Sequence, residues 1–406
     1  MTNPAPARAP VSPSDVGLYV HFPYCEKKCP YCDFNSHVAP HDDVRYADAI
    51  LAELDRRAPR YLPAGRRFRT LYFGGGTPSL WDPAQVARVI AHVKAQHGLA
   101  DDAEITLEAN PGTVHTALFE RFVAGGVTRF SIGAQSFVDA ELVQLGRIHA
   151  ARASSAAVRL AKASGARVSL DLMYAQPDQA RADVDRSLDA ALALEPDHVS
   201  AYTLTVEPGT ALGRRFEAGT FTPMDDDAQA ELIEHVTARL EAAGHLRYEV
   251  SSYAAPGKEA VHNTLYWVGG PYLGLGAGAH SYLPSAGLAE AERRANVKSP
   301  GEYERRALDG DETPGFVETL ARRDVVAERL MLGVRTRFGL DLARLADDAG
   351  LALDALDRAL APGLAPLLRQ GLLVREDAVL RPSARGFLFT DAIGRTMLEL
   401  ADAIPL

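Results

Sequence analysis

The stretch YVHFPYCEKKCPYCDFNSH (residues 19–37) contains all three cysteines of this 406-residue chain, in the spacing Cys25-x3-Cys29-x2-Cys32. An odd number of cysteines argues against a disulfide framework, and their clustering favours one shared ligand over three separate buried thiols. Three thiolates are one short of a closed tetrahedral zinc site, which His37 would complete as Cys3His. The alternative is an iron–sulfur cluster held by three thiolates, with one iron left open for another ligand.

The sequence around this loop predicts an α/β fold. Runs rich in β-branched and aromatic residues alternate with helical patterns, and they occupy residues 17–22, 70–75, 104–109, 129–134, 167–174 and 198–204. Most of these runs are apolar throughout, which is typical of parallel strands buried on both faces. Two of the intervening helical patterns end at Gly98 and Gly165, which suit helix C-termini. A (β/α) barrel, open or closed, and a doubly wound sheet both fit this alternation.

The positions of the polar residues favour a partial (β/α) barrel that resembles a TIM barrel. Residues with polar side chains or glycine lie at or just beyond the C-terminal ends of five predicted strands: Cys25, Gly75, Glu108, Gln135 and Asp171. In a (β/α) barrel the chemistry takes place at that end. We therefore expect these residues to converge on one cavity.

Composition limits the remaining possibilities. The formal net charge is −10, so the chain as a whole has no attraction for nucleic acid. Residues 1–15 are rich in proline and alanine and are expected to form a flexible tail. No apolar run approaches the roughly 18 residues that span a bilayer, so we expect a cytoplasmic protein.

The texture of the sequence changes near residue 300. Helical patterns at 324–350 and 353–371 precede a predicted hairpin at 372–383. We therefore expect a barrel domain over 16–295 and a smaller winged-helix-like α+β domain over 300–406. Such a module binds DNA or serves as a packing or partner-contact domain, and the acidic chain favours the second role.

The cysteine spacing, placed directly after the first predicted strand, resembles that of the radical S-adenosylmethionine (SAM) superfamily. The glycine-rich segment FGGGTPSL (73–80) after the second strand agrees with this, since bare backbone amides can approach a ligand. By itself this segment is equally consistent with an ordinary tight turn. The resemblance implies a [4Fe–4S] cluster whose open iron binds SAM and whose electron cleaves the SAM sulfonium.

Further motifs resemble one branch of that superfamily, which contains oxygen-independent coproporphyrinogen III oxidases and HemW-type haem chaperones. These motifs include LYVHFPYC, CPYCDF, LEANPG, SIGAQSF, LGRIH, LDLMYAQP, HNTLYW and YLGLGAGAHSY, in that order. The resemblance implies that Tyr19, the three cysteines, Gly75 and Glu108 contact the cluster or its SAM. It also implies an aromatic role for Tyr31 inside the cysteine loop and a SAM-pocket role for Gly76, Thr77, Gln135, Arg147 and Asp171.

Two departures favour the chaperone over the oxidase. Phe34 occupies the position of a fourth cysteine in the oxidase, and few residues precede the first strand, where the oxidase has a longer arm. The resemblance then implies haem as cargo, acceptor haemoproteins such as membrane-bound respiratory enzymes as partners, and a homodimer. His262 in HNTLYW is a candidate haem contact, or else a hydrogen-bonded core residue. The alternative function is oxidative decarboxylation of coproporphyrinogen III. We assign no catalytic residue, and whether the chain is an enzyme stays open.

Overall fold

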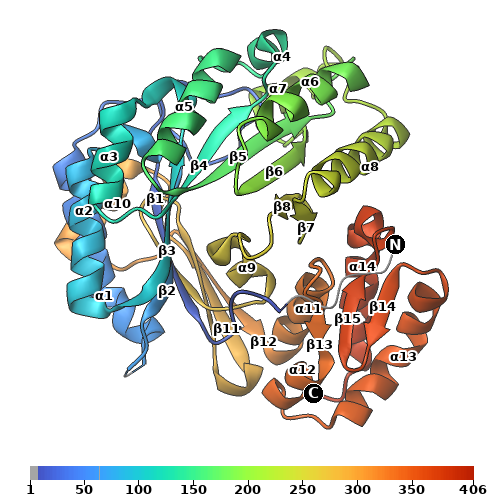
Figure 1. Cartoon of the computed structure of the whole chain (residues 1–406). Coiled ribbons are helices and arrows are strands. Elements are labelled where there is room, and N and C mark those ends of the chain that lie inside the picture. The colour runs from blue at the N-terminus through green and yellow to red at the C-terminus, as the bar shows by residue number, and fades with distance from the viewer. Residues whose placement is uncertain (1–7, 64) are drawn as a thin grey trace.

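The computed structural model describes residues 8–63 and 65–406. Its strands fall into a large sheet and a small one (Figure 1). The strands of the large sheet are β1 (Val16–Phe22), β2 (Phe68–Gly75), β3 (Leu99–Ala109), β4 (Arg129–Gln135), β5 (Arg167–Tyr174), β6 (His198–Thr203), β7 (Leu246–Arg247), β8 (Ser252–Ala254), β9 (Tyr272–Leu275), β10 (His280–Pro284), β11 (Glu290–Ala295) and β12 (Phe316–Ala321). The small sheet contains β13 (Leu340–Asp341), β14 (Leu373–Glu376) and β15 (Val379–Pro382). All six strands predicted from the sequence are present, as β1 to β6.

Helices lie between the strands of both sheets. They are α1 (Asp43–Tyr61), α2 (Pro83–His92), α3 (Thr116–Ala124), α4 (Asp139–Gln144), α5 (Ala151–Ala163), α6 (Arg181–Leu192), α7 (Ala211–Glu217), α8 (Asp226–Ala242), α9 (Val261–Trp267), α10 (Pro300–Asp309), α11 (Arg322–Gly333), α12 (Leu342–Asp348), α13 (Leu353–Arg369) and α14 (Thr390–Leu400). Gly98 and Gly165 each follow a predicted helical segment. Both have a positive φ, as expected of glycines that end helices.

The large sheet is an open barrel rather than a doubly wound sheet. Its strand order is β12-β11-β10-β9-β1-β2-β3-β4-β5-β6-β8-β7, and the strands from β9 to β6 are parallel. Strands β1 to β6 follow chain order without the reversal of a doubly wound fold. The sheet curves with helices such as α1, α2, α3 and α5 on its outer side (Figure 1). Because β1 to β6 all run the same way, their C-terminal ends meet at one edge of the sheet.

Local sequence determines how the outer helices begin. The Asp42 carboxylate accepts hydrogen bonds from the backbone amides of Val44 and Arg45 at the start of α1. Asp82 accepts from the amide of Ala84 at the start of α2, where Pro83 holds the first helical position. These side chains satisfy amides that have no partner inside the helix. The apolar faces of both helices then pack on the sheet in one continuous hydrophobic core.

The C-terminal unit has the arrangement of a winged helix, as predicted. Helices α11, α12 and α13 precede the β14–β15 hairpin, and β13 adds a third strand to it. The packing differs from the predicted boundary at residue 300, because β12 is a strand of the large sheet and α10 packs on the core of the barrel. Tyr303 on α10 is buried in the core of the barrel, and β12 pairs with β11 along its whole length. The C-terminal unit therefore begins with α11.

The segment before β1 was predicted to be a flexible tail, of which residues 1–7 lie outside the described part. In residues 8–15 the structure differs from that prediction, since Val11 is only 7% exposed and packs against Val261 and Leu265 of α9. An apolar side chain buried in this way ties the segment to the domain. In the described part of the chain, no helix is long and apolar enough to cross a membrane.

Candidate functional site

The cysteines lie on a loop that leaves the C-terminal end of β1 and closes on itself. The amide of Cys25 donates to the carbonyl of His37 at 3.0 Å, and the amide of His37 donates to the carbonyl of Pro23 at 2.7 Å. The side-chain amide of Asn35 donates to the carbonyls of Ala277, just after the neighbouring strand β9, and of Lys298, just before α10. These hydrogen bonds hold the two ends of the loop together and attach it to the neighbouring part of the sheet.

The donors around the sulfur atoms fit an iron–sulfur cluster. The hydroxyl of Thr77 donates to Cys25 Sγ at 3.3 Å, and Arg147 Nη1 lies 3.6 Å from Cys29 Sγ. Burial raises the pKa of the Cys25 and Cys32 thiols, and such thiolates need nearby donors or a metal to form. Iron–sulfur clusters are held by thiolates and tuned by hydrogen bonds of this kind.

The zinc alternative does not fit the same geometry. In the described part of the chain, the three sulfur atoms do not all lie within 4.8 Å of one another. A tetrahedral site with Zn–S bonds of about 2.3 Å would bring them to roughly 3.8 Å. The Nε2 of His37 is also already hydrogen-bonded, at 3.1 Å from Asn35 Oδ1. The wider arrangement of the thiols suits an iron–sulfur cluster, in which each cysteine binds a different iron.

Glycines at the end of β2 let backbone approach the cysteine loop. Gly75 has a φ of 115°, and a Cβ there would lie 2.5 Å from the ring of His21. A Cβ on Gly76 would lie 2.6 Å from the carbonyl oxygen of Tyr24. Only glycine fits either position, because the turn packs directly on β1 and on the start of the loop that carries the cysteines. An ordinary tight turn would not require this close packing.

Glu108 at the end of β3 faces the same space. Tyr72 donates its hydroxyl to Glu108 Oε1 at 2.7 Å, and the amide of Gly75 donates to Oε2 at 3.0 Å. Burial raises the pKa of Glu108 to about 7, against the opposing effect of these hydrogen bonds. Tyr19 of β1 stacks on Tyr72 with ring centroids 6.0 Å apart. The carboxyl group is therefore held in place by hydrogen bonds, and burial brings its pKa close to neutral pH.

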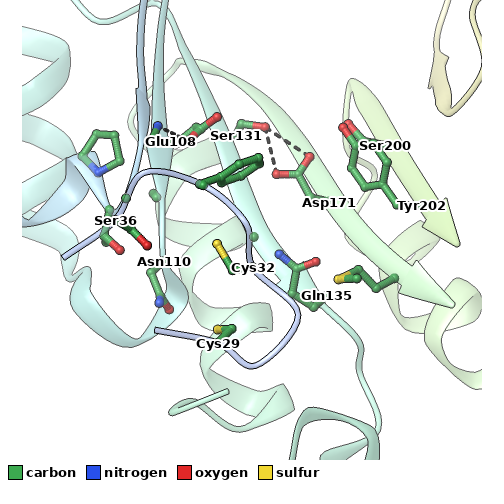
Figure 2. Close-up of a pocket in the computed structure, with 18 of the residues that line it drawn as sticks. Cys29, Cys32, Ser36, Glu108, Asn110, Ser131, Gln135, Asp171, Ser200 and Tyr202 are labelled. Carbon is green, nitrogen blue, oxygen red and sulfur yellow. Dashed lines mark hydrogen bonds between the residues drawn. The ribbon is translucent and has the colours of Figure 1, made fainter. Parts of the chain in front are cut away.

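A second carboxyl group faces the cavity from β5. Ser131 on β4 donates to the two oxygens of Asp171 at 3.2 and 3.1 Å (Figure 2). Burial raises the pKa of Asp171, and the buried Arg129 opposes that rise. The figure places the cysteine loop on one side of the space and Asp171 on the other. A cationic ligand in this space would meet the carboxyl groups of Glu108 and Asp171, both of which are held by hydrogen bonds.

One cavity of about 550 Å³ collects all the site residues predicted from the sequence. Its lining includes Tyr19, Cys25, Cys29, Tyr31, Cys32, Gly75, Gly76, Thr77, Glu108, Gln135, Arg147, Asp171 and His262. Arg147 also donates to the carbonyl of Gly133 at 3.0 Å, and Gln135 has a positive φ of 65°. A non-glycine residue in that region of φ is strained and often occurs at a functional site. The expected convergence of the strand ends on one cavity is confirmed.

Sequence reasoning missed several polar residues of the same cavity. Ser131, Ser200 and Arg129 lie inside apolar runs, where they resemble ordinary strand residues. The strand register provides the missing signal, because Glu108 lies opposite Ser131 and Asp171 opposite Ser200. Neighbouring residues at one register level face the same side of the sheet, so an inward carboxyl group marks its neighbours as lining residues.

His262 lies in the wall of the cavity but is only 2% exposed. Its Nδ1 is 2.7 Å from the Thr70 hydroxyl oxygen, and its Nε2 is 2.7 Å from that of Tyr266. Burial lowers the pKa of the ring to about 3, so the imidazole is neutral. In this conformation neither nitrogen is free to bind iron, as expected of the hydrogen-bonded core residue that was the alternative interpretation.

The open barrel with three cysteines after β1 and a glycine turn after β2 defines the class, a radical SAM protein. The model of the Radical SAM superfamily matches residues 19–191, and that of the HemN C-terminal domain matches residues 320–389. The family implies a [4Fe–4S] cluster and SAM. A solved structure described as "Coproporphyrinogen III oxidase (HemN) from Escherichia coli is a Radical SAM enzyme" superposes with a TM-score of 0.79 at 23% identity, over 95% of this chain and 91% of that one. At this identity the likeness establishes the fold.

Sequence comparison narrows the class to one family. The "Heme chaperone HemW" of Mycobacterium tuberculosis strain H37Rv is 40% identical over 97% of this chain and 97% of its own length. The protein of the same name from Escherichia coli K12 is 44% identical over 65% of this chain and 69% of its own. A Bos taurus relative, "Radical S-adenosyl methionine domain-containing protein 1, mitochondrial", is 37% identical over 94% and 87%. The chain therefore belongs to the HemW family of radical SAM proteins.

Proposed function

We propose that this chain is a haem chaperone, which binds haem and transfers it to acceptor haemoproteins. The observation that carries the proposal is the 40% identity, over 97% of both chains, to a protein named as a haem chaperone. That match includes the barrel, the cavity and the C-terminal unit. The likeness to the oxidase extends over almost as much of the chain but at 23% identity, where it supports the fold alone.

The cavity has residues for the cluster and SAM that the family implies. Cys25, Cys29 and Cys32 would hold the cluster, and Thr77 and Arg147 would donate to its sulfur ligands. When bound and reduced, such a cluster would supply one electron for cleavage of the SAM sulfonium. The backbone of the Gly75 turn and the carboxyl groups of Glu108 and Asp171 would orient the SAM amine and ribose, since each is already fixed by hydrogen bonds.

The alternative is oxidative decarboxylation of coproporphyrinogen III. It draws support from the shared open barrel and from the SAM-pocket residues, which an oxidase also needs. Phe34 argues against it. Its side chain is 59% exposed on the rim of the cavity, where the oxidase has a fourth cysteine.

One preparation tests both functions. The full chain is loaded with its cluster anaerobically and then given either hemin or coproporphyrinogen III with SAM and an electron donor. We expect stoichiometric hemin uptake and transfer to an apo-haemoprotein, with no protoporphyrinogen formed. Turnover of coproporphyrinogen without stable hemin binding would contradict the proposal and support the oxidase.

The proposed function includes acceptor haemoproteins, a homodimer, a cytoplasmic location and no binding to nucleic acid. The identity of the acceptors, among them membrane-bound respiratory enzymes, is tested by transfer assays with candidate apo-proteins. The homodimer is tested by sedimentation of the cluster-loaded chain, and the cytoplasmic location by fractionation of expressing cells. The prediction of no nucleic-acid binding is tested by a shift assay with duplex DNA, since winged helices often bind DNA.

A further inference from the structure

A second cavity, of about 720 Å³, lies beside the first. Its walls come from the cysteine loop, from the β9–β10 edge of the sheet and from α11 of the C-terminal unit. The two cavities share Tyr19, Phe34 and Glu108, so they are neighbours across one wall. A volume of this size is within the range of pockets that bury a cofactor or drug-sized ligand, about 300–1,000 Å³.

His280 at the start of β10 is the histidine of this cavity with free ring nitrogens. Three histidines line it, and His21 bonds through both nitrogens to Tyr19 and Asn35. His37 bonds through Nε2 to Asn35, whereas in the described part of the chain the ring of His280 makes no hydrogen bond. Burial and the nearby charges of Arg293 and Lys298 lower the pKa of His280, so its imidazole is neutral. A neutral, unbonded imidazole is a common ligand for iron.

Arg329 brings a buried positive charge to the same cavity. It lies on α11, is only 8% exposed, and its Nε has no hydrogen-bond partner. Among the residues that the structure describes, no carboxylate lies within ion-pair distance of it. Burying an unpaired charge is costly, so a guanidinium held in this way favours an anionic ligand that can pair with it.

Three further cations line the cavity, and they differ in how they are paired. Lys28 Nζ donates to the backbone carbonyls of Phe34 and Ser36 at 3.0 and 3.5 Å. Arg293 is neutralised, because both oxygens of Glu328 accept from its Nη2 at 2.7 and 2.8 Å. Lys298 is exposed and, in the described part of the chain, forms no ion pair. Arg329 and Lys298 therefore leave two positive charges available, beside one free imidazole.

Aromatic side chains complete the lining. The rings of Tyr266 and Tyr272 meet edge to face with centroids 4.7 Å apart, and Tyr282 stacks near Tyr272 at 6.2 Å. Phe34 adds an exposed apolar ring. The cavity thus combines a flat apolar lining, an iron-ligating side chain and two free cations. These features match a planar macrocycle with a central iron and two carboxylates.

We propose that the haem cargo is held in this second cavity, with His280 as an axial ligand to the iron and with Arg329 and Lys298 paired to the two propionates. The inference rests on the proposed haem-chaperone function and adds where the cargo is held. The haem would then be beside the cluster and SAM cavity, separated from it by Tyr19, Phe34 and Glu108.

The experiment titrates the full, cluster-loaded chain with hemin and follows the Soret band and the electron paramagnetic resonance of the ferric haem. His280→Ala should remove the spectral signature of an axial imidazole and weaken binding by roughly tenfold or more. The pair of substitutions Arg329→Gln and Lys298→Ala should weaken binding about 10–100-fold without changing that signature. His115→Ala is the matched control, because His115 is exposed and lines neither cavity.

The outcomes separate this inference from the function on which it rests. If the unaltered chain does not bind hemin, the proposed function fails. If it binds hemin but His280→Ala and His280→Gln keep its spectrum and affinity, the location proposed here is overturned while the function stands. Hemin dimethyl ester has no free propionates, so equal affinity for hemin and its ester would overturn the role of Arg329 and Lys298.

Discussion

The hydroxyl of Thr77 donates a hydrogen bond to Cys25 Sγ across 3.3 Å. This contact joins the loop after β1, which carries the three cysteines, to the turn after β2, which carries Gly75 and Gly76. Both residues are at the C-terminal ends of adjacent parallel strands, which explains why residues 52 positions apart in the chain meet. The contact should also affect the reduction potential of the cluster, because hydrogen bonds to the cluster thiolates help to set that potential.

Thr77→Ala should lower the reduction potential of the [4Fe–4S] cluster. A hydrogen bond to the thiolate favours the reduced, more negative state, and a loss of about 0.5–1.5 kcal/mol corresponds to about 20–65 mV for one electron. Thr77→Ser retains the hydroxyl and is the matched control. A redox titration followed by electron paramagnetic resonance measures both, and equal potentials in the two variants would contradict a direct role of the hydroxyl.

SAM binding should depend on pH through Glu108. Its pKa is raised by burial from 4.5 to about 7, so below that pH the carboxyl is protonated and cannot pair with the SAM amine. Affinity should therefore rise with pH by up to roughly tenfold per unit up to about pH 7 and then level off. Calorimetry between pH 5 and 8 measures this, and Glu108→Gln should give a weaker, flat profile. A slope that persists in the Gln variant would assign the titration to another group.

The same pKa has an effect on stability without ligand. A carboxyl whose pKa is raised by folding favours the folded state when protonated, so its stabilisation is present below pH 4.5 and is lost as the pH rises through about 7. In the ligand-free chain Glu108→Gln should therefore lessen the fall in unfolding free energy between those pH values. Urea unfolding at pH 5 and pH 7.5 compares the two chains, and equal falls would mean that Glu108 is better solvated than its burial implies.

Substitution of His262 by alanine should destabilise the fold, whereas the same substitution of His280 should leave its stability almost unchanged. His262→Ala should lower the free energy of unfolding by about 2–4 kcal/mol, since it leaves the buried hydroxyls of Thr70 and Tyr266 without their partner. His280→Ala should change it by no more than about 0.5 kcal/mol, because the side chain is exposed and unbonded. Denaturant unfolding measures both. Similar losses of stability in the two variants would contradict the separation into a core residue and a ligand.

The six strands, the cysteine loop and the convergence of strand ends could be predicted because each depends on local spacing. Cys25, Glu108 and Asp171 needed only the rule that parallel strands end at one edge. The boundary of the C-terminal unit could not be predicted in this way. Tyr303 on α10 joins the barrel by donating a hydrogen bond to Glu53, 250 positions earlier in the chain. Long-range packing of this kind leaves no local pattern in the sequence.

The second cavity was missed for a related reason. His280 and Arg329 come from different units of the fold, and each looks ordinary in the sequence. His280 follows a glycine-rich run, and Arg329 lies in an amphipathic helix with charged neighbours. In the described structure the ring of His280 makes no hydrogen bond, and the guanidinium of Arg329 is buried with Tyr282 as a neighbour but without a carboxylate to pair with. A missing partner is a property of the packed molecule, and only coordinates reveal it.

Phe34 is an apolar side chain that is 59% exposed and lines both cavities. Phe34→Ser should weaken hemin binding about 3–10-fold, because a ring that contacts a macrocycle loses that apolar contact. Stability should stay within about 0.5 kcal/mol, since an exposed ring contributes little to the core. Phe216→Ser is the matched control, with a ring 49% exposed that lines neither cavity. Hemin titration and urea unfolding are measured on both variants, and equal hemin affinities would exclude Phe34 from the haem contact.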